Sequence, residues 1–214
     1  MKHRDELNSS FFGDKLSKDL FIRVMKHNLQ LILQFHNESM RLMGNQVFEI
    51  ENKIAKTPDR NTRNTLIADK QIYIGTFYEM QRWNTFLMMY SYLEEFFYHL
   101  WKLNYMGELP YESGIKRFKP VLESVLKMDL GRDSDWQVVC SYQKLRDCLL
   151  HANGRIDLLR KGSDSANLER IVSSSTNLDI KSNHIILTDE FLQEVNLVLL
   201  SFIERIGIEA QLSQ

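Results

Sequence analysis

The sequence predicts an all-α protein, a bundle of four to five helices with a small β-hairpin before the last helix. Three observations indicate this class. The 214 residues include only 9 Gly and 3 Pro, so few positions interrupt a helix. Apolar residues recur every three or four positions over long stretches, which is the spacing of one helix face. One segment, LDIKSNHIIL at 178–187, has apolar ends around a polar centre and predicts the hairpin.

Composition and charge are ordinary for a globular protein. Apolar residues make up 43% of the chain and charged residues 26%, and the formal net charge is -1. Because the chain is not basic overall, binding to nucleic acid would depend on a local patch of positive charge. The polar start MKHRDELNSS has no signal-peptide core, and no apolar run reaches the length of a membrane span. We therefore expect a cytoplasmic protein without a membrane partner.

The first predicted helix runs from about residue 16 to the KTPDRN break at 56–61. Its apolar positions recur in steps of three, four or seven, at Leu16, Leu20, Val24, Leu31, Phe35, Leu42 and Ile50. A stripe of about ten turns fits either one helix or two helices with a bend near Gly44. We expect residues 1–60 to form a long helical extension that packs on a helical domain of residues 61–214.

The second predicted helix begins between residues 61 and 65 and continues to about Asn104. Its first half is amphipathic, but its second half, FLMMYSYLEEFFYHLW, is apolar on nearly every side. A helix with that pattern belongs in the centre of a bundle. We interpret its Met and aromatic residues, and His99 with them, as parts of the core.

Two shorter helices are predicted next. One lies within residues 115–129, with Pro120 in its first turn. The other begins with Ser134 and Gln137 in a capping-box arrangement and ends near His151, where Asn153-Gly154 is a common helix stop. Its expected buried side carries Val138, Tyr142, Leu145 and Leu149.

The C-terminal third combines a predicted loop with the hairpin and a last helix. The Ser-rich stretch 160–177 is polar, and we expect a loop there. After the hairpin, Thr188 is placed to cap a helix from Asp189 to about Ile206.

The two cysteines, Cys140 and Cys148, lie eight residues apart on one predicted helix. That spacing is about 12 Å along a helix axis, which is too long for a disulfide. We expect reduced cysteines. Because neither has a histidine at ligand spacing, the sequence predicts no metal site and no cofactor.

The candidate functional residues lie in RDCLLHANG, residues 146–154. Asp147 and His151 are four apart and share a helix face, and the long side chain of Arg146 can reach the same region. Arginine can hold a phosphate with two hydrogen bonds, and histidine exchanges protons near neutral pH. This pair suits metal-free cleavage of RNA, in which the 2'-OH attacks the adjacent phosphorus. The candidate substrate-binding residues follow it: Asn153, Arg155, Arg160 and Lys161.

The same residues also have structural interpretations. A histidine at a helix C-terminus interacts favourably with the helix dipole, and adjacent Arg and Asp can form a solvated pair. The other histidines considered, His27, His36 and His184, have no partners in the sequence pattern and receive no role. Four cations at the start of the first helix form a basic face that we interpret as solvated: Lys15, Lys18, Arg23 and Lys26.

Together these features resemble the HEPN superfamily (higher-eukaryote and prokaryote nucleotide-binding domains). That family is an all-α bundle whose late helix carries Arg-x4–6-His, commonly with a polar residue after the arginine. Here the signature is Arg146, Asp147 and His151, followed by HANGRI. The apolar helix around Ser91 to Glu94 is similar to an earlier core helix of the family. The resemblance covers about residues 65–206.

The resemblance implies a metal-independent endoribonuclease that acts as a toxin or phage-defence effector, often with an antitoxin. It implies a composite site across a homodimer, with Arg146 binding or stabilising the phosphate, His151 as general acid and base, and Asp147 orienting the histidine or the arginine. Glu94 is an accessory candidate. Many members carry Asn where this chain has Asp147, which adds negative charge beside the phosphate.

Two alternatives stay open at this point. Some members of the superfamily only bind nucleotides or proteins, so the chain can be a non-catalytic scaffold. It can also be a plain helical interaction protein in which the motif has no role.

Overall fold

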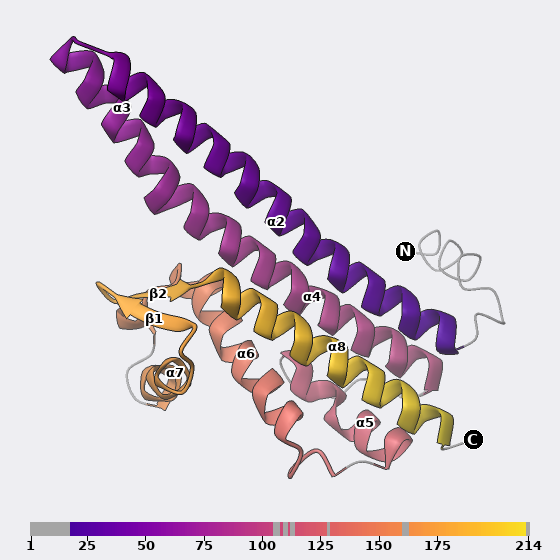
Figure 1. Ribbon diagram of the computed structural model, residues 1–214. Coiled ribbons are helices and arrows are strands. Elements are labelled where there is room, and N and C mark those ends of the chain that lie inside the picture. Colours follow the sequence, from indigo (N-terminus) through magenta and orange to yellow (C-terminus); the bar gives the residue numbers. More distant parts are fainter. Residues whose placement is uncertain are drawn as a thin grey trace.

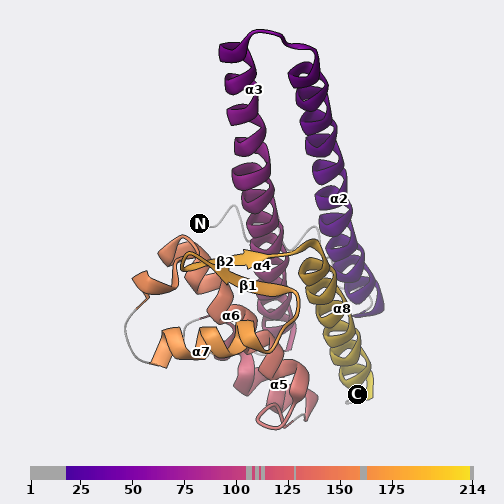
Figure 2. The ribbon, with the colours of Figure 1, turned by 60° about the vertical axis from the view of Figure 1, so that its left-hand side comes forward.

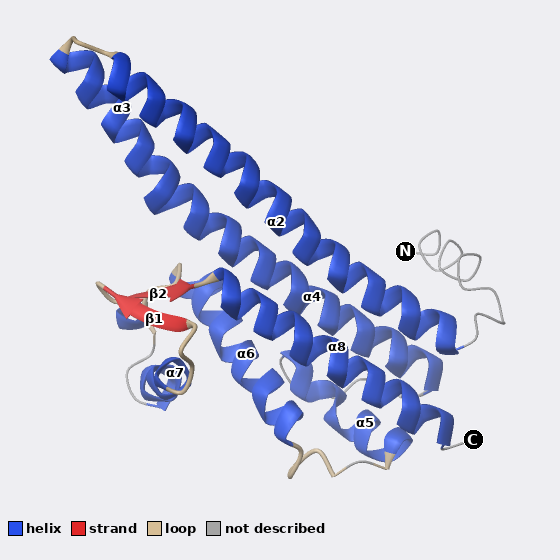
Figure 3. Ribbon diagram, in the orientation of Figure 1, coloured by secondary structure: helices blue, strands red, loops and turns tan. Residues whose placement is uncertain are grey.

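The computed structural model describes residues 18–104, 108, 111, 114–127, 129–159 and 163–212. Helices make up most of this part of the chain, and one small hairpin is present (Figure 3). In chain order the main elements are α2 (Lys18–Lys56), α3 (Arg60–Ile72), α4 (Tyr78–Asn104), α5 (Lys119–Leu126), α6 (Ser134–Ala152), α7 (Ser163–Ser173), β1 (Leu178–Lys181), β2 (His184–Leu187) and α8 (Asp189–Leu212). The predicted all-α bundle with a hairpin before the last helix is confirmed.

Two parts of the molecule differ in shape (Figures 1 and 2). α2 runs beside the continuous α3–α4 helix, and the joined ends of this helix pair extend well beyond the other elements. We call residues 37–84 the arm and the rest of the described chain the body. In the body, α4 packs with α2, α6 and α8, and the near half of α2 also packs along α8. Within the described helices, none combines the length and apolarity needed to cross a membrane.

The core of the body is rich in aromatic rings. Phe97 contacts the rings of Phe118, Trp136 and Phe202, which bring three further elements onto α4. All four rings are at most 3% exposed. Burying one such side chain contributes roughly 1.5–3 kcal/mol relative to leaving it in water, so this cluster fixes the centre of the bundle.

The predicted central helix is confirmed in α4, with two exceptions. Its buried apolar residues follow steps of one and three, at Phe86, Met89, Tyr90, Leu93, Phe96, Phe97 and Leu100. Met88 and Tyr98 were expected in the core but are exposed, at 46% and 38%. Both lie off the buried face of α4, because even a central helix of a small bundle has one side facing water.

The long N-terminal helices are less interrupted than the sequence allowed. α2 is one helix through Gly44, because a single interior glycine costs only about 1 kcal/mol. α3 joins α4 through a short π-helical stretch, Tyr73–Phe77, that includes Gly75. The turn at residues 57–59 ends in Asp59, whose carboxylate accepts a hydrogen bond of 2.7 Å from the Thr62 backbone N–H.

The beginning of α6 is shifted from the prediction by one residue. The capping side chain is Asp133, not Ser134, and it accepts a hydrogen bond of 2.8 Å from the Trp136 N–H. Arg205 of α8 forms ion pairs with Asp133 and with Asp135, which fixes the capping carboxylate in place. With this start, Val139 faces the core, while Val138, which was expected to be buried, is 37% exposed.

The predicted loop at 160–177 is wrong over most of its length, because Ser163–Ser173 form α7. Leu168 and Val172, four residues apart, are both buried against the body. Serine disfavours a helix only weakly, so the burial of one apolar face outweighs it. Residues 160–162 lie outside the described part of the chain.

The hairpin and the last helix agree with the prediction. β1 and β2 are antiparallel, with Leu178 opposite Leu187, and a two-residue turn at Ser182 and Asn183 joins them. Both turn residues have positive φ, 49° and 65°, as a type I′ turn requires. Thr188 Oγ1 accepts a hydrogen bond of 3.1 Å from the Phe191 N–H and caps α8, which continues to Leu212 rather than ending near Ile206.

Candidate functional site

The side chain of Arg146 lies between two carboxylates. Its Nη1 donates a hydrogen bond of 2.8 Å to Asp147 Oδ1, and its Nη2 lies 3.9 Å from Glu94 Oε2 of α4. The Arg146 side chain is 26% exposed and that of Glu94 is 20% exposed. Arg146 Nε is buried and has no hydrogen-bond partner among the described residues. Two of the predicted residues and the accessory candidate therefore meet at one place.

Burial and neighbouring charges shift the pKa values of Glu94 and Arg146 in opposite directions. Burial raises the pKa of Glu94, and the nearby Arg146 and Arg117 reduce that effect. Burial disfavours the Arg146 cation, but the hydrogen bond to Asp147 and the charge of Glu94 outweigh it, so the pKa of Arg146 is raised. The Arg146 guanidinium therefore stays charged beside a carboxyl group whose own ionised form burial disfavours.

His151 is exposed in the last turn of α6 and does not join this cluster. No hydrogen bond or ion pair of its side chain is found within the described residues. Five positions on an α-helix correspond to a rotation of about 140°, so Arg146 and His151 leave α6 in different directions. Asp147 and His151 are about 40° apart and do share a side. The convergence of Arg146 with His151 stays a prediction.

The residues after α6 fasten it to the hairpin and to α4. Asn153 ends the helix in the left-handed conformation, with φ of 50°, and Gly154 follows with φ of 73°. A Cβ atom at Gly154 would lie 2.8 Å from the ring of Trp83 on α4. The Gly154 carbonyl accepts a hydrogen bond of 3.0 Å from the Ile185 N–H of β2. These contacts set where the exposed end of α6 lies.

The four candidate substrate-binding residues differ in their exposure and in their contacts, and only two of them lie in the described part of the chain. Asn153 is exposed at the helix end. The guanidinium of Arg155 makes two hydrogen bonds to Asp157, of 2.5 and 3.0 Å, so an acid neighbour already occupies it. Arg160 and Lys161 lie outside the described residues.

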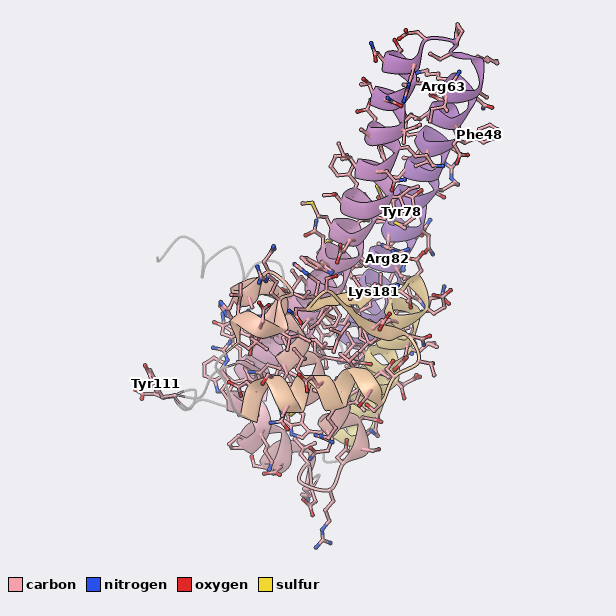
Figure 4. All side chains as sticks on the ribbon, turned by 90° about the vertical axis from the view of Figure 1, so that its left-hand side faces the viewer. Phe48, Arg63, Tyr78, Arg82, Tyr111 and Lys181 are labelled. Carbon is pink, nitrogen blue, oxygen red and sulfur yellow. The ribbon has the colours of Figure 1, made fainter. Side chains whose placement is uncertain are left out.

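A buried polar network that the sequence did not reveal lies where the arm joins the body. His36, which is 1% exposed, lies with Nδ1 3.0 Å from Thr85 Oγ1 and Nε2 3.2 Å from Asp189 Oδ1. Arg82 donates to the same carboxylate, from Nε to Oδ1 at 2.7 Å. The network therefore joins α2, α4 and α8, and Figure 4 shows Arg82 near the base of the arm.

Burial and hydrogen bonds act in opposite directions on the pKa values of this network. Burial lowers the pKa of His36, and the hydrogen bond to Asp189 only partly opposes that effect. Burial alone would raise the pKa of Asp189, but the hydrogen bonds from Arg82 and His36 outweigh it and lower that pKa. His36 and Thr85 are at most 2% exposed, so a substrate cannot reach them, and we interpret the network as structural.

Described residues also form hollows outside the Arg146 cluster, of which two matter here. One, the basic pocket, has a volume of about 320 Å³ and is formed by residues of α5, α6, α7 and the turn Gly114–Phe118. The other is an apolar groove of about 800 Å³ between α2 and α4 that includes Phe35 and Met88. In the described part of the chain, no group of three or more His, Cys, Asp or Glu residues is arranged to hold a metal ion. Both cysteines are free thiols.

Comparison with known proteins identified no relative of this chain. No family model matches the chain, and no curated protein and no solved structure matches it. The function therefore has to be inferred from the residues and their geometry.

Proposed function

We propose that this chain is a metal-independent endoribonuclease of the HEPN type. The observation that supports it is an arginine held between Asp147 and Glu94, five residues before an exposed histidine at the end of the same helix. An arginine in a fixed orientation and an accessible imidazole are the two groups that this reaction needs. The sequence resemblance assigns the same two residues to it.

The reaction divides between these groups as follows. The imidazole of His151 takes the proton of a ribose 2'-OH, the 2'-oxygen forms a bond to phosphorus, and the bond from phosphorus to the 5'-oxygen breaks. An imidazolium returns a proton to the leaving 5'-oxygen. The free N–H groups of Arg146 stabilise the charge that builds up on the phosphoryl oxygens. Asp147 and Glu94 hold the guanidinium in place.

The different directions of Arg146 and His151 favour a composite site. In a homodimer with a two-fold axis beside α6, His151 of one copy lies near Arg146 of the other. Each copy then contributes half of each site, and RNA binds across the interface. A toxin or phage-defence effector in the cytoplasm, controlled by an antitoxin or another partner protein, is the biological role that we propose with it.

Incubation of the purified protein with total RNA in EDTA tests this proposal. We expect cleavage, and a loss of roughly 100-fold or more in rate for His151→Ala and for Arg146→Ala, since a general acid–base group and a group that stabilises transition-state charge each contribute about that much. His27→Ala and Arg132→Ala are matched controls at exposed positions and should cleave normally. Intact RNA with the wild-type protein, or equal rates in all variants, would rule the ribonuclease out.

A second candidate function has an observation of its own. The ion pair between Arg146 and Glu94 connects α6 to α4, so the motif can serve to hold the bundle together in a non-catalytic scaffold. In that case Arg146→Ala and Glu94→Gln lower the melting temperature. His151→Ala, whose imidazole has no partner in the described chain, changes neither the melting temperature nor any property related to RNA.

A further inference from the structure

The basic pocket collects four cations from four separate elements. Lys116 comes from the turn Gly114–Phe118, Lys119 from α5, Lys144 from α6 and Arg170 from α7. Ser141 and Cys140 of α6 also line the hollow. These cations lie up to 54 positions apart in the sequence, so their approach is a product of the fold.

Acids of the described chain balance only part of the positive charge in this pocket. Lys119 lies 3.5 Å from Glu123, but Lys116, Lys144 and Arg170 form no ion pair with another described residue. Cys140 lies within the electrostatic field of the three lysines. Burial raises the pKa of this thiol, and Lys116, Lys119 and Lys144 each act in the opposite direction. The lysine charges therefore act on one point, where a bound anion reduces their mutual repulsion.

The dimensions and donors suit a small oxyanion. A hollow of about 320 Å³ is at the lower end of ligand-binding pockets in proteins. Three ammonium groups and a guanidinium supply N–H donors from several directions, and guanidinium binds phosphate oxygens in pairs. The hydroxyl of Ser141 donates to the Gln137 carbonyl, so the lysines and Arg170 are the main donors available.

We propose that the basic pocket binds a phosphate group, carried either by a small phosphorylated compound or by the backbone of a nucleic acid. This site is separate from the Arg146 cluster and does not depend on RNA cleavage. Lys144, Asp147 and His151 follow one another along one side of α6 in steps of three and four. An RNA strand at His151 thus has a path along α6 to the pocket.

Alkylation of Cys140 by iodoacetamide, located by mass spectrometry, measures occupation of the pocket. Cys140 lines the hollow, and Cys148 is an internal control because it is 0% exposed. We expect inorganic phosphate to slow the labelling of Cys140 roughly tenfold at about ten times its dissociation constant, relative to chloride at equal ionic strength. Equal rates in phosphate and chloride would overturn the proposal.

A single-stranded DNA oligonucleotide, which has no 2'-OH to react, separates the two sources of phosphate. Protection by both inorganic phosphate and the oligonucleotide indicates that a nucleic-acid backbone reaches the pocket. Protection by inorganic phosphate alone indicates a small phosphorylated compound. Arg146→Ala should keep either protection, so a failed ribonuclease assay and a failed pocket can be told apart.

Variants with fewer charges show whether the cations of the pocket cause the protection of Cys140 by phosphate. The double variant Lys144→Gln with Arg170→Gln should lose the protection, while Lys56→Gln with Arg60→Gln, at the tip of the arm, should retain it. Each protein is compared with and without phosphate, which removes any change in the intrinsic reactivity of Cys140. Circular dichroism confirms that each variant folds. Equal loss of protection in both double variants would mean a diffuse charge effect and no site.

Discussion

The arm and the body show how differently two helical regions of one chain can be stabilised. No residue from 37 to 84 is buried, whereas α4, α6 and α8 share a continuous core in the body. The arm is only two helices thick, so its apolar side chains contact one neighbour and water. Several are largely exposed: Leu42, Phe48, Ile67, Ile72, Ile74, Phe77 and Met80. Figure 4 shows Phe48 and Arg63 near the tip.

The arm depends on local interactions that a two-helix hairpin can supply. Arg63 donates two hydrogen bonds to the Thr57 carbonyl, of 2.7 and 3.1 Å, beside the Asp59 cap. Lys70 of α3 pairs with Glu51 of α2 at 2.5 Å. Exposed pairs of this kind contribute little each, while the body gains from every buried ring. The same substitution should therefore have very different consequences in the two regions.

The largest difference is expected from removing an aromatic ring. Phe97→Ala should lower the free energy of unfolding by about 3–5 kcal/mol, because the ring is 1% exposed and leaves a cavity. Phe48→Ala, in which the ring is 64% exposed, should change it by no more than about 0.5 kcal/mol. Urea unfolding of both variants measures this. A large loss at Phe48 would show that a partner or a second copy covers the arm.

Two Gly→Ala substitutions, one in the body and one in the arm, should change the stability in opposite directions. Gly154→Ala combines a positive φ with a close approach to Trp83 and should cost about 1–3 kcal/mol. Gly75→Ala places a Cβ where no atom lies within 4 Å, in a helical stretch, and should stabilise by about 0.4–1 kcal/mol. Thermal unfolding of the two variants compares them directly. If both destabilise, the arm is more tightly constrained at Gly75 than its open surroundings indicate.

A smaller effect is expected where the two regions join, at His36 and Asp189. The folded-state pKa values of His36 and Asp189 lie below the ordinary values of these groups, 6.5 and 3.8 respectively, so the unfolded chain binds protons more readily. Their contributions to stability are complete above about pH 7 and are lost as pH falls, first through the His36 range and then through the Asp189 range. His36→Gln should flatten the first part of this dependence. Urea unfolding at several pH values measures it, and an unchanged slope would contradict the assignment.

The Arg146 cluster was only partly predictable. Arg146 and Asp147 are adjacent, so the sequence allowed an ion pair between them without requiring it, and Glu94 was a candidate without a known distance. The basic pocket left no signal, because the sequence positions of Lys116, Lys144 and Arg170 are unrelated by any local period. The same is true of His36 and Asp189, which lie 153 positions apart.

The sequence by itself determined the helices with strong periodicity, the hairpin with its two-residue turn, and the Thr188 cap, because backbone preferences and nearest neighbours decide these. Only the tertiary structure decided that α7 is a helix, that Asp133 replaces Ser134 as the cap, and that the arm is left uncovered. The first two depend on contacts between separate elements, of Leu168 and Val172 with the rest of the body and of Arg205 with Asp133. The third depends on the lack of another helix beside the arm in the described chain. Local conformational preferences depend on neighbouring residues in the sequence, so the sequence alone predicts them. The burial of a helix face or of a charged group depends instead on which other elements the fold packs beside it.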